Sequence, residues 1–525
     1  MNKLFQTPRR RLYTAAIAGG MAGLLFPPYF FWFLLPVPFF FLYGTLDKAD
    51  HDETFRLGMT FAIVFYLFHT YWFFSFHPVA LPFMMIFLGC VHGAVFYGVS
   101  WMGMGPFSFS AGWMIIQGIL GYGYHAFPWS RLATSMAEIP LLIQPVRWLG
   151  EWGWGGLLVA CFVVCSDYLI NRRTAISAWV LILFVVGFFT AGAVTFFTIT
   201  LDRTNRMAML VQPSVESNFA MSSPRKQLRI LNDLTEKHAR EGDFVVWPET
   251  AVIREPFQLD GEQLNWTHEN WKEYFHGLLE PGFDLLTGLR FTDPQPNKLP
   301  RLNGAALIEY PADPTAFYTK RRPVPGGEHL PFMGSVGWVR TVGKFFGTLG
   351  YRGGEKGGLI PVSTERGQLN AGVLICFEDA FSQDVRQQVQ DGADLLINIS
   401  NDSWSRSRAS HWQHFYRARV RAVETGRMVL RNGNTGVSGF IDPLGRVDQQ
   451  LKPYKRGTLR GAIVLPLEDT IHNKLGAVTP IALIVLFGLL SLTRSLLTNV
   501  KNFLDRGTPS KGYTFPQKFL RSFKH

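Results

Sequence analysis

The feature that most constrains this fold is a succession of apolar segments in its first 200 residues. A helix needs about 20 mainly apolar residues to cross the hydrocarbon core of a bilayer. Segments of this kind lie near residues 12–26, 29–46, 57–75, 81–104, 111–126, 153–170 and 175–200, and one more lies near 474–493. The sequence therefore predicts a multi-span membrane protein with about eight helices, seven of them before residue 201.

The placement of Lys and Arg predicts how these helices are oriented. The first apolar segment follows a basic start, but no clear small-residue cleavage site comes after it, so we expect a retained helix. Basic residues favour the cytoplasmic side. They lie at 9–11, at 172–173 and in the tail 495–525. Seven crossings would then place residues 201–472 outside the cytoplasm and both termini inside it.

Residues 201–472 have a different character from the segments on either side. Short β-like runs alternate there with amphipathic helical stretches, which predicts an α/β layered domain with buried sheets. We therefore expect a membrane bundle at 1–200, an α/β domain at 201–472, a membrane helix at 473–494 and a basic cytoplasmic tail at 495–525. The net charge of +12 lies largely near the two ends, and no basic-aromatic module indicates nucleic-acid binding.

Three reactive side chains in this domain each come at or shortly after the end of a predicted strand. Cys376 is the only cysteine between residues 201 and 472 and follows the run 373–375. Glu249 follows 244–248, and Lys320 follows 316–319. Strand ends bring side chains from distant positions to one rim of a sheet, where many α/β sites are assembled.

The chemistry of these three residue types suits acyl transfer. A cysteine is an intrinsically strong nucleophile, and a carboxylate such as Glu249 can take its proton. An ammonium such as Lys320 favours the thiolate and can stabilise an oxyanion, where one donor contributes about 3–4 kcal/mol. Each residue alone has a plainer interpretation, as buried filler for Cys376, a cap for Glu249 and part of a solvated charge run for Lys320. The joint pattern favours a thioester-forming centre.

The segments around these residues carry a resemblance to a known family. They are 246–249, 318–328, 374–378, 399–404, 414–415, 419–424 and 434–437. In these segments the chain resembles the nitrilase (carbon–nitrogen hydrolase) superfamily, and most closely its membrane family, apolipoprotein N-acyltransferase. The resemblance extends through the whole of 201–472 in the family's order, with seven predicted spans before it and one after.

The resemblance implies a fold, a reaction and a set of site residues. The fold would be an αββα sandwich on a helical membrane bundle. Glu249 would be the general base, Lys320 the oxyanion-stabilising cation and Cys376 the nucleophile. Two further acids would take part, Glu328 in support of the triad and Glu378 beside the nucleophile.

The reaction implied is the transfer of a fatty acyl chain from a glycerophospholipid to the N-terminal α-amine of a diacylglyceryl-cysteine apolipoprotein. No metal or cofactor is implied. The resemblance places the enzyme in the bacterial inner membrane with its catalytic domain on the periplasmic side. We expect a monomer.

Some positions depart from the family's pattern. Gly326 stands where an aromatic residue is usual, and Phe377 replaces the usual tyrosine after the nucleophile. The segment 403–411 also differs from the usual run. With the triad intact, these departures bear on substrate preference and rate more than on the class of reaction.

Two regions contain candidate lipid-facing residues. Trp129, between the fifth and sixth predicted spans, is either an interfacial belt residue or part of a rim facing lipid or substrate. Residues 331–358 carry Trp338, Phe345 and Phe346 among many glycines. This segment is either a loop with a small core of its own or a mobile apolar arm that enters the bilayer and gates a lipid substrate.

Two other functions stay open at this point. A membrane-tethered amidase could use the same triad, because water and an amine compete for one acyl-enzyme. The multi-span bundle argues against it, since tethering needs only one helix. A non-catalytic lipid or lipoprotein carrier would not need an intact triad.

Overall fold

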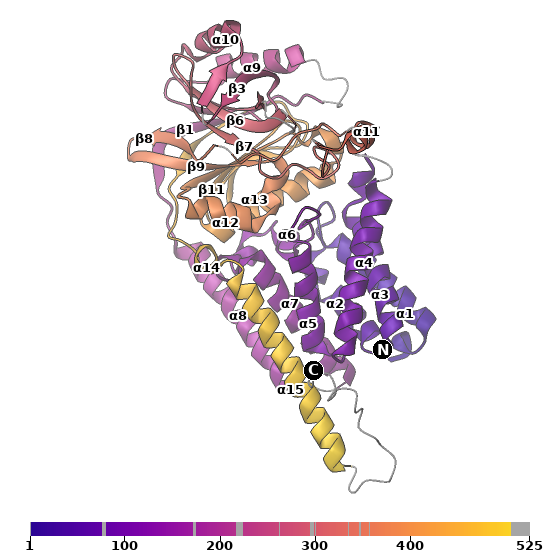
Figure 1. Cartoon of the computed structure of the whole chain (residues 1–525). Coiled ribbons are helices and arrows are strands. Elements are labelled where there is room, and N and C mark those ends of the chain that lie inside the picture. The colour runs from indigo at the N-terminus through magenta and orange to yellow at the C-terminus, as the bar shows by residue number, and fades with distance from the viewer. Residues whose placement is uncertain are drawn as a thin grey trace, which may run out of the picture.

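The computed structural model describes residues 2–75, 80–171, 175–216, 224–261, 263–293, 299, 301–333, 335–345, 348–355 and 357–505. A helical bundle lies on one side of the molecule and two stacked sheets lie on the other (Figure 1). The longer bundle helices are α1 (Pro8–Leu24), α2 (Pro36–Leu46), α3 (His51–His69), α4 (Ala80–Trp101), α5 (Pro106–Ile119), α7 (Val146–Asn171), α8 (Ala175–Thr198) and α15 (Val478–Asp505).

Each predicted span corresponds to one of these helices, with shifted boundaries. Within the described part of the chain, four helical segments are long and apolar enough to cross a membrane: Leu81–Trp101, Val146–Asn171, Ala175–Thr198 and Val478–Leu497. The predicted span 29–46 is divided, because a short 3-10 turn precedes α2, which begins at Pro36. The predicted span 111–126 is α5, which begins earlier, at Pro106. Proline is favoured in the first helical turn, where its missing N–H has no partner to lose.

Small residues let the bundle helices approach closely. A Cβ added at Gly19 of α1 would lie 2.3 Å from the carbonyl oxygen of Phe61 in α3. A Cβ added at Gly23 of α1 would lie 2.5 Å from Cβ of Phe68, also in α3. Close backbone approach at small residues is the usual basis of helix packing in membranes. The packing of α1 on α3 is therefore the kind expected within a bilayer.

The other part of the chain forms two sheets. The first has the order β14-β1-β2-β5-β3-β4, with β6 paired to β5 and β7 paired to β6. Its strands are β1 (Arg203–Gln212), β2 (Phe244–Val246), β3 (Val252–Asp260), β4 (Gln263–Trp266), β5 (Asp284–Thr292), β6 (Arg301–Glu309), β7 (Asp313–Thr319) and β14 (Gly457–Val464). The second has the order β13-β12-β11-β10-β9-β8. Its strands are β8 (Ile360–Thr364), β9 (Gly367–Ile375), β10 (Leu395–Ser400), β11 (Met428–Gly433), β12 (Ser438–Ile441) and β13 (Val447–Leu451).

The two sheets face each other across one apolar core, and helices cover their outer faces. Alternate residues of β1 show this, because Leu210 packs in the core shared with the second sheet and Val211 packs on the outer side. This is the two-residue period of a strand buried on both faces. The outer helices are α9 (Pro224–His238) and α10 (Glu269–Leu279) on the first sheet and α12 (Ser382–Gln390) and α13 (Arg408–Thr425) on the second. The expected αββα sandwich joined to a helical bundle is therefore confirmed.

Helix α13 lies between the second sheet and the bundle (Figure 1). It is buried along its length from Ala409 to Thr425, with only Trp412 partly exposed. Two of its arginines, Arg417 and Arg419, bind backbone oxygens on the bundle side of the structure. Arg417 donates to the carbonyl oxygens of Pro128 and Trp129, at 2.8 Å and 2.6 Å. A polar helix is thus buried because two layers cover it from opposite sides.

Candidate active site

The strand ends bring the three predicted catalytic residues together. The Lys320 ammonium, which follows β7, lies 3.2 Å from Oε1 of Glu249, which follows β2. It also lies 3.0 Å from Oε1 of Glu328. Cys376 follows β9 directly and is close enough to Glu249 and Lys320 for both charges to act on its thiol. Lys320 is 1 % exposed and Glu249 and Cys376 are 4 % exposed, so the cluster is shielded from water.

The carboxylate of Glu249 is held by donors on both of its oxygens. Asn303 of β6 donates from Nδ2 to Oε1 at 2.7 Å, and the backbone N–H of Asn401 donates to Oε2 at 2.8 Å. Gly288 of β5 allows this approach, because a Cβ there would lie 2.4 Å from the carbonyl oxygen of Pro248. Glu249 is therefore fixed in orientation before any substrate binds.

Lys320 keeps its positive charge in spite of being buried. Burial lowers the pKa of an ammonium, but the carboxylates of Glu249 and Glu328 outweigh this and hold the pKa of Lys320 well above its usual range. Glu328 is itself oriented, since the N–H of Val324 donates to its Oε2 at 2.8 Å. A fixed cation of this kind can stabilise negative charge that develops beside it.

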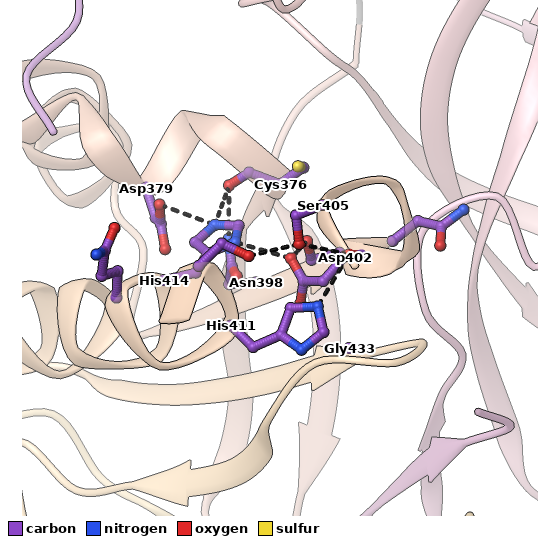
Figure 2. Close-up of polar contacts among 12 residues, drawn as sticks. Cys376, Asp379, Asn398, Asp402, Ser405, His411, His414 and Gly433 are labelled. Atoms are coloured by element: carbon purple, nitrogen blue, oxygen red, sulfur yellow. Dashed lines mark hydrogen bonds and ion pairs between the residues drawn. The ribbon is translucent and has the colours of Figure 1, made fainter. Parts of the chain in front are cut away.

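Cys376 occupies an unusual backbone conformation. Its φ of 53° is in the left-handed region, which side chains other than glycine rarely adopt. Its carbonyl oxygen accepts hydrogen bonds from Nε2 of His414 at 2.9 Å and from Nδ2 of Asn398 at 3.4 Å (Figure 2). In that view the sulfur of Cys376 points away from the side on which His414 and Asn398 bind its carbonyl oxygen. Strained conformations persist where the surroundings hold them, and they cluster at functional sites.

The thiol of Cys376 is neutral in the resting site. Burial and then the charge of Glu249 raise its pKa well above the usual value, and the opposing effect of Lys320 is smaller. The ammonium therefore does not by itself produce a standing thiolate. Nucleophilic attack by such a thiol needs a base that removes its proton during the reaction. Glu249 is the carboxylate whose charge acts most strongly on this thiol.

Glu378 acts on the backbone around the site. Its carboxylate accepts hydrogen bonds from the N–H groups of Arg321 at 2.7 Å, Arg322 at 3.1 Å and Ile375 at 2.8 Å. It also accepts one from the hydroxyl of Tyr318 at 3.1 Å. Burial raises the pKa of Glu378 to about 7, although hydrogen bonds from the backbone oppose the shift. Glu378 thus ties the end of β7, which carries Lys320, to the end of β9, which carries Cys376.

Phe377 connects the nucleophile to the bundle. Its ring stacks on Trp129, with centroids 5.9 Å apart and an angle of 23° between the planes. Trp129 is only 3 % exposed, and Cζ of the Arg417 guanidinium lies 4.3 Å from the centroid of its ring. Trp129 is thus enclosed by protein, which argues against the lipid-facing alternative. Its place on a rim facing the substrate stays a prediction. Trp129 packs its ring on Phe377, the residue next to Cys376.

The segment predicted to form an apolar arm is partly described. It contains the helix α11 (Gly337–Phe345), on which Trp338 is 71 % exposed. The side chain of Phe345 and all of Phe346 lie outside the described residues. Gly326, just before this segment, has a φ of 78°, a conformation that glycine adopts readily and a bulky residue rarely.

Several residues of the site were not found from the sequence. Asn303 and Asn401 orient Glu249, and His414 binds the backbone of the nucleophile. The family resemblance includes the segments that contain Asn401 and His414, but it implies no role for either residue. No group of three or more His, Cys, Asp or Glu residues in the described ranges is arranged to hold a metal ion.

Comparison with known proteins matches both parts of the chain. A family model described as carbon-nitrogen hydrolase matches residues 221–472. A second, described as the N-terminal domain of apolipoprotein N-acyltransferase, matches residues 18–165. Among solved structures, Saccharomyces cerevisiae Nit3 of the nitrilase superfamily is 18% identical, covering 53% of this chain and 95% of its own, with a TM-score of 0.35.

Curated relatives match over nearly their full length. The protein of Rhizobium rhizogenes is 26% identical over 92% of this chain and 97% of its own. The protein of Allorhizobium ampelinum is 27% identical over 89% of this chain and 92% of its own. The protein of Photobacterium profundum is 25% identical over 93% of this chain and 95% of its own. All three carry the name apolipoprotein N-acyltransferase.

Proposed function

Since the chain belongs to the apolipoprotein N-acyltransferase family, we propose that it transfers a fatty acyl chain from a glycerophospholipid to the N-terminal α-amine of a diacylglyceryl-cysteine lipoprotein. The observation that carries this proposal is the buried cluster of Glu249, Lys320 and Glu328 beside Cys376, on a domain packed against a bundle of apolar helices. A nucleophile, a base and a cation suit acyl transfer, and the bundle suits a lipid donor.

The first half-reaction forms the acyl-enzyme. The sulfur of Cys376 attacks the ester carbonyl of the phospholipid while Glu249 takes the thiol proton. The resulting oxyanion is stabilised by the ammonium of Lys320. Collapse of the tetrahedral intermediate breaks the ester C–O bond, and the leaving alkoxide takes the proton from Glu249. The products are a lysophospholipid and a thioester on Cys376.

The second half-reaction consumes the thioester. The neutral α-amine of the diacylated lipoprotein attacks the thioester carbonyl, and Glu249 takes a proton from the amine. The C–S bond then breaks, an amide forms, and the thiolate recovers its proton from Glu249. One donor and one acceptor thus use the same three side chains in succession.

The proposal includes an arrangement in the membrane. We place the catalytic domain at 201–472 on the periplasmic side of a bacterial inner membrane, with the bundle at 1–200, the helix at 473–494 and the basic tail at 495–525 completing the chain. The distribution of basic residues supports this orientation. The exposed Trp338 on α11 supports a role for the arm at the lipid surface.

A two-substrate assay tests the function. The purified protein is incubated with a phospholipid carrying a labelled acyl chain and with a synthetic diacylglyceryl-cysteine peptide that has a free α-amine. The same peptide with its amine acetylated is the control. The expected result is an amide-linked label on the free peptide, one lysophospholipid for each transfer, and none on the control. Release of labelled fatty acid in place of transfer, with acceptor present, would indicate a hydrolase and contradict the proposal.

A further inference from the structure

A second polar cluster lies behind the nucleophile, on the side away from the sulfur (Figure 2). Its centre is the ring of His414 on α13, which is 2 % exposed. Nδ1 lies 2.9 Å from Oδ1 of Asp402. Nε2 lies 2.9 Å from the carbonyl oxygen of Cys376 and 3.2 Å from Oδ1 of Asp379. Both ring nitrogens therefore face oxygen atoms that only accept hydrogen bonds.

This geometry fixes the protonation of the ring. A neutral imidazole has one N–H and one lone pair, so one nitrogen would place a lone pair against an oxygen lone pair. An imidazolium has an N–H on each nitrogen and satisfies both sides. The pKa of His414 is raised accordingly, because Asp379 and Asp402 outweigh burial and the charge of Arg431, which both lower it.

We propose that His414 is a positioning residue that acts as an imidazolium and holds the Cys376–Phe377 peptide from behind during acylation. The inference rests on the proposed function, because acylation of Cys376 is the step it serves. His414 does not touch the substrate. It acts through the carbonyl oxygen to which it donates.

The surroundings of His414 support a lasting positive charge. Asp379 comes from the turn after β9, and Asp402 from the turn after β10. Arg431 of β11 lies 3.0 Å from Oδ2 of Asp402 and 4.0 Å from Oδ2 of Asp379. Two carboxylates and two cations then form a balanced buried cluster, which avoids the cost of an unpaired charge.

The remaining neighbours of the ring do not compete for this role. On the same helix, burial lowers the pKa of His411, which is therefore neutral, and that ring binds the backbone oxygen of Asp402 at 3.0 Å. Arg417, also on α13, directs its guanidinium to Trp129 and to backbone oxygens. The Trp129 ring lies 5.6 Å from the His414 ring and carries no charge.

Holding this peptide has a consequence for catalysis. Among the described residues, cis peptide bonds occur only before Pro28 and Pro311, so the Cys376–Phe377 peptide is trans. In a trans peptide the N–H points away from the carbonyl oxygen. When His414 and Asn398 fix the carbonyl, they also fix the Phe377 N–H on the opposite side. There it can donate to the oxyanion formed when the sulfur attacks.

Two substitutions of His414 distinguish the hydrogen bond made at the Nε2 position from the one made at the Nδ1 position. In His414→Gln the amide nitrogen can occupy the place of Nε2 and still donate to Cys376, without the charge. In His414→Asn the amide reaches only the place of Nδ1 and the donor to Cys376 is lost. His411→Gln removes a buried neutral imidazole one turn earlier and is the matched control.

The experiment follows single-turnover acylation of Cys376 by a diacyl phospholipid between about pH 6 and pH 9, the range in which a histidine changes charge. Loss of an oxyanion donor costs about 100-fold or more, so loss of a group that positions one is expected to cost about 10-fold in His414→Asn. His414→Gln should recover part of that loss. The wild-type rate should fall more steeply with rising pH than the rate of either His414 variant, and His411→Gln should keep the wild-type profile. A decline caused by ionisation of Glu378, whose pKa is about 7, is common to all four proteins.

Equal pH profiles for wild type and the His414 variants would overturn the inference, as would rates in both variants that match wild type. If neither variant folds, the wild-type profile decides alone, since acylation that does not decline at higher pH contradicts a required imidazolium. Failure of the wild-type protein to acylate at any pH would instead refute the proposed function. The two ideas therefore fail in distinguishable ways.

Discussion

Lys320 and Glu249 form an ion pair of 3.2 Å between side chains that are 1 % and 5 % exposed. Glu328 supplies a second carboxylate to the same ammonium, with Oε2 at 2.9 Å. When Glu249 takes the proton of Cys376, Lys320 therefore keeps one anionic partner and remains in place. The cation is then less compensated at the moment when the oxyanion forms, so its stabilising effect is concentrated in the transition state.

Replacement Glu249→Gln should abolish acylation and leave the protein folded. The amide preserves the shape of the side chain but cannot accept the thiol proton, and general base catalysis contributes about 100- to 10,000-fold. Single-turnover acylation by a diacyl phospholipid measures the loss. Glu255→Gln is the control, because that carboxylate pairs with Arg301 at the surface of β3. Similar rates in both variants would show that Glu249 is not the base.

Replacement Asn303→Asp should inactivate the site by excess charge. Asn303 donates to Oε1 of both Glu249 and Glu328, at 2.7 Å and 3.3 Å. A third carboxylate would face these two with a single ammonium between them, and like charges raise the pKa of one member. Activity and the unfolding temperature should both fall at neutral pH, and the unfolding temperature should partly recover in acid. A variant as stable as wild type at neutral pH would contradict this account.

Replacement Gln413→Glu should loosen the contact between the bundle and the catalytic domain. The amide of Gln413 accepts from the indoles of Trp72 and Trp129, at 3.0 Å and 2.7 Å. It donates to the carbonyl oxygens of Pro27 and His69, at 2.8 Å and 2.9 Å. A carboxylate cannot donate, so two buried acceptors lose their partner at a cost of about 2–4 kcal/mol.

Thermal unfolding in detergent tests the change at Gln413. Gln450→Glu on the exposed strand β13 is the control and should leave the midpoint unchanged. The unfolding midpoint of Gln413→Glu should be clearly lower than the midpoints of the wild-type protein and of Gln450→Glu. Equal midpoints for the two variants would show that Gln413 does not stabilise the interface.

The pH dependence of stability should report Glu378. Its pKa of about 7 in the folded protein lies above the value of about 4.3 in an unfolded chain. Ionisation of Glu378 therefore costs more free energy in the folded protein than in the unfolded chain. The contribution of protonated Glu378 to folding stability is complete below about pH 4 and is lost as the pH rises through about 7. Relative to Glu378→Gln, the wild-type unfolding temperature should decline between about pH 5 and pH 8. Parallel pH profiles for the two proteins would contradict the assignment.

The sequence predicted those parts of the site that depend on local pattern. An apolar strand followed by a reactive side chain is visible in one dimension, so Glu249, Lys320 and Cys376 could be placed at strand ends. The apolar helices were equally visible. Partners such as Asn303 and Asn401 could not be found this way, because their role depends on which strands become neighbours.

Helix α13 shows the other limit of prediction from sequence. Its polar residues, such as Gln413, His414 and Arg417, are typical of a helix with a solvated face. They are buried because the second sheet covers one side and the bundle the other. The same arrangement explains why Trp129 is enclosed by protein when its sequence position favours a membrane interface.

Intact mass spectrometry after incubation with a diacyl phospholipid tests the central claim most directly. The account predicts one fatty-acyl increment on the wild-type protein, mapped to Cys376 by peptide analysis and absent from Cys376→Ala. Cys90→Ala should retain the increment, since that exposed cysteine lies in the bundle helix α4. An increment of equal size on Cys376→Ala, or none on a folded wild-type protein, would contradict a thioester at Cys376.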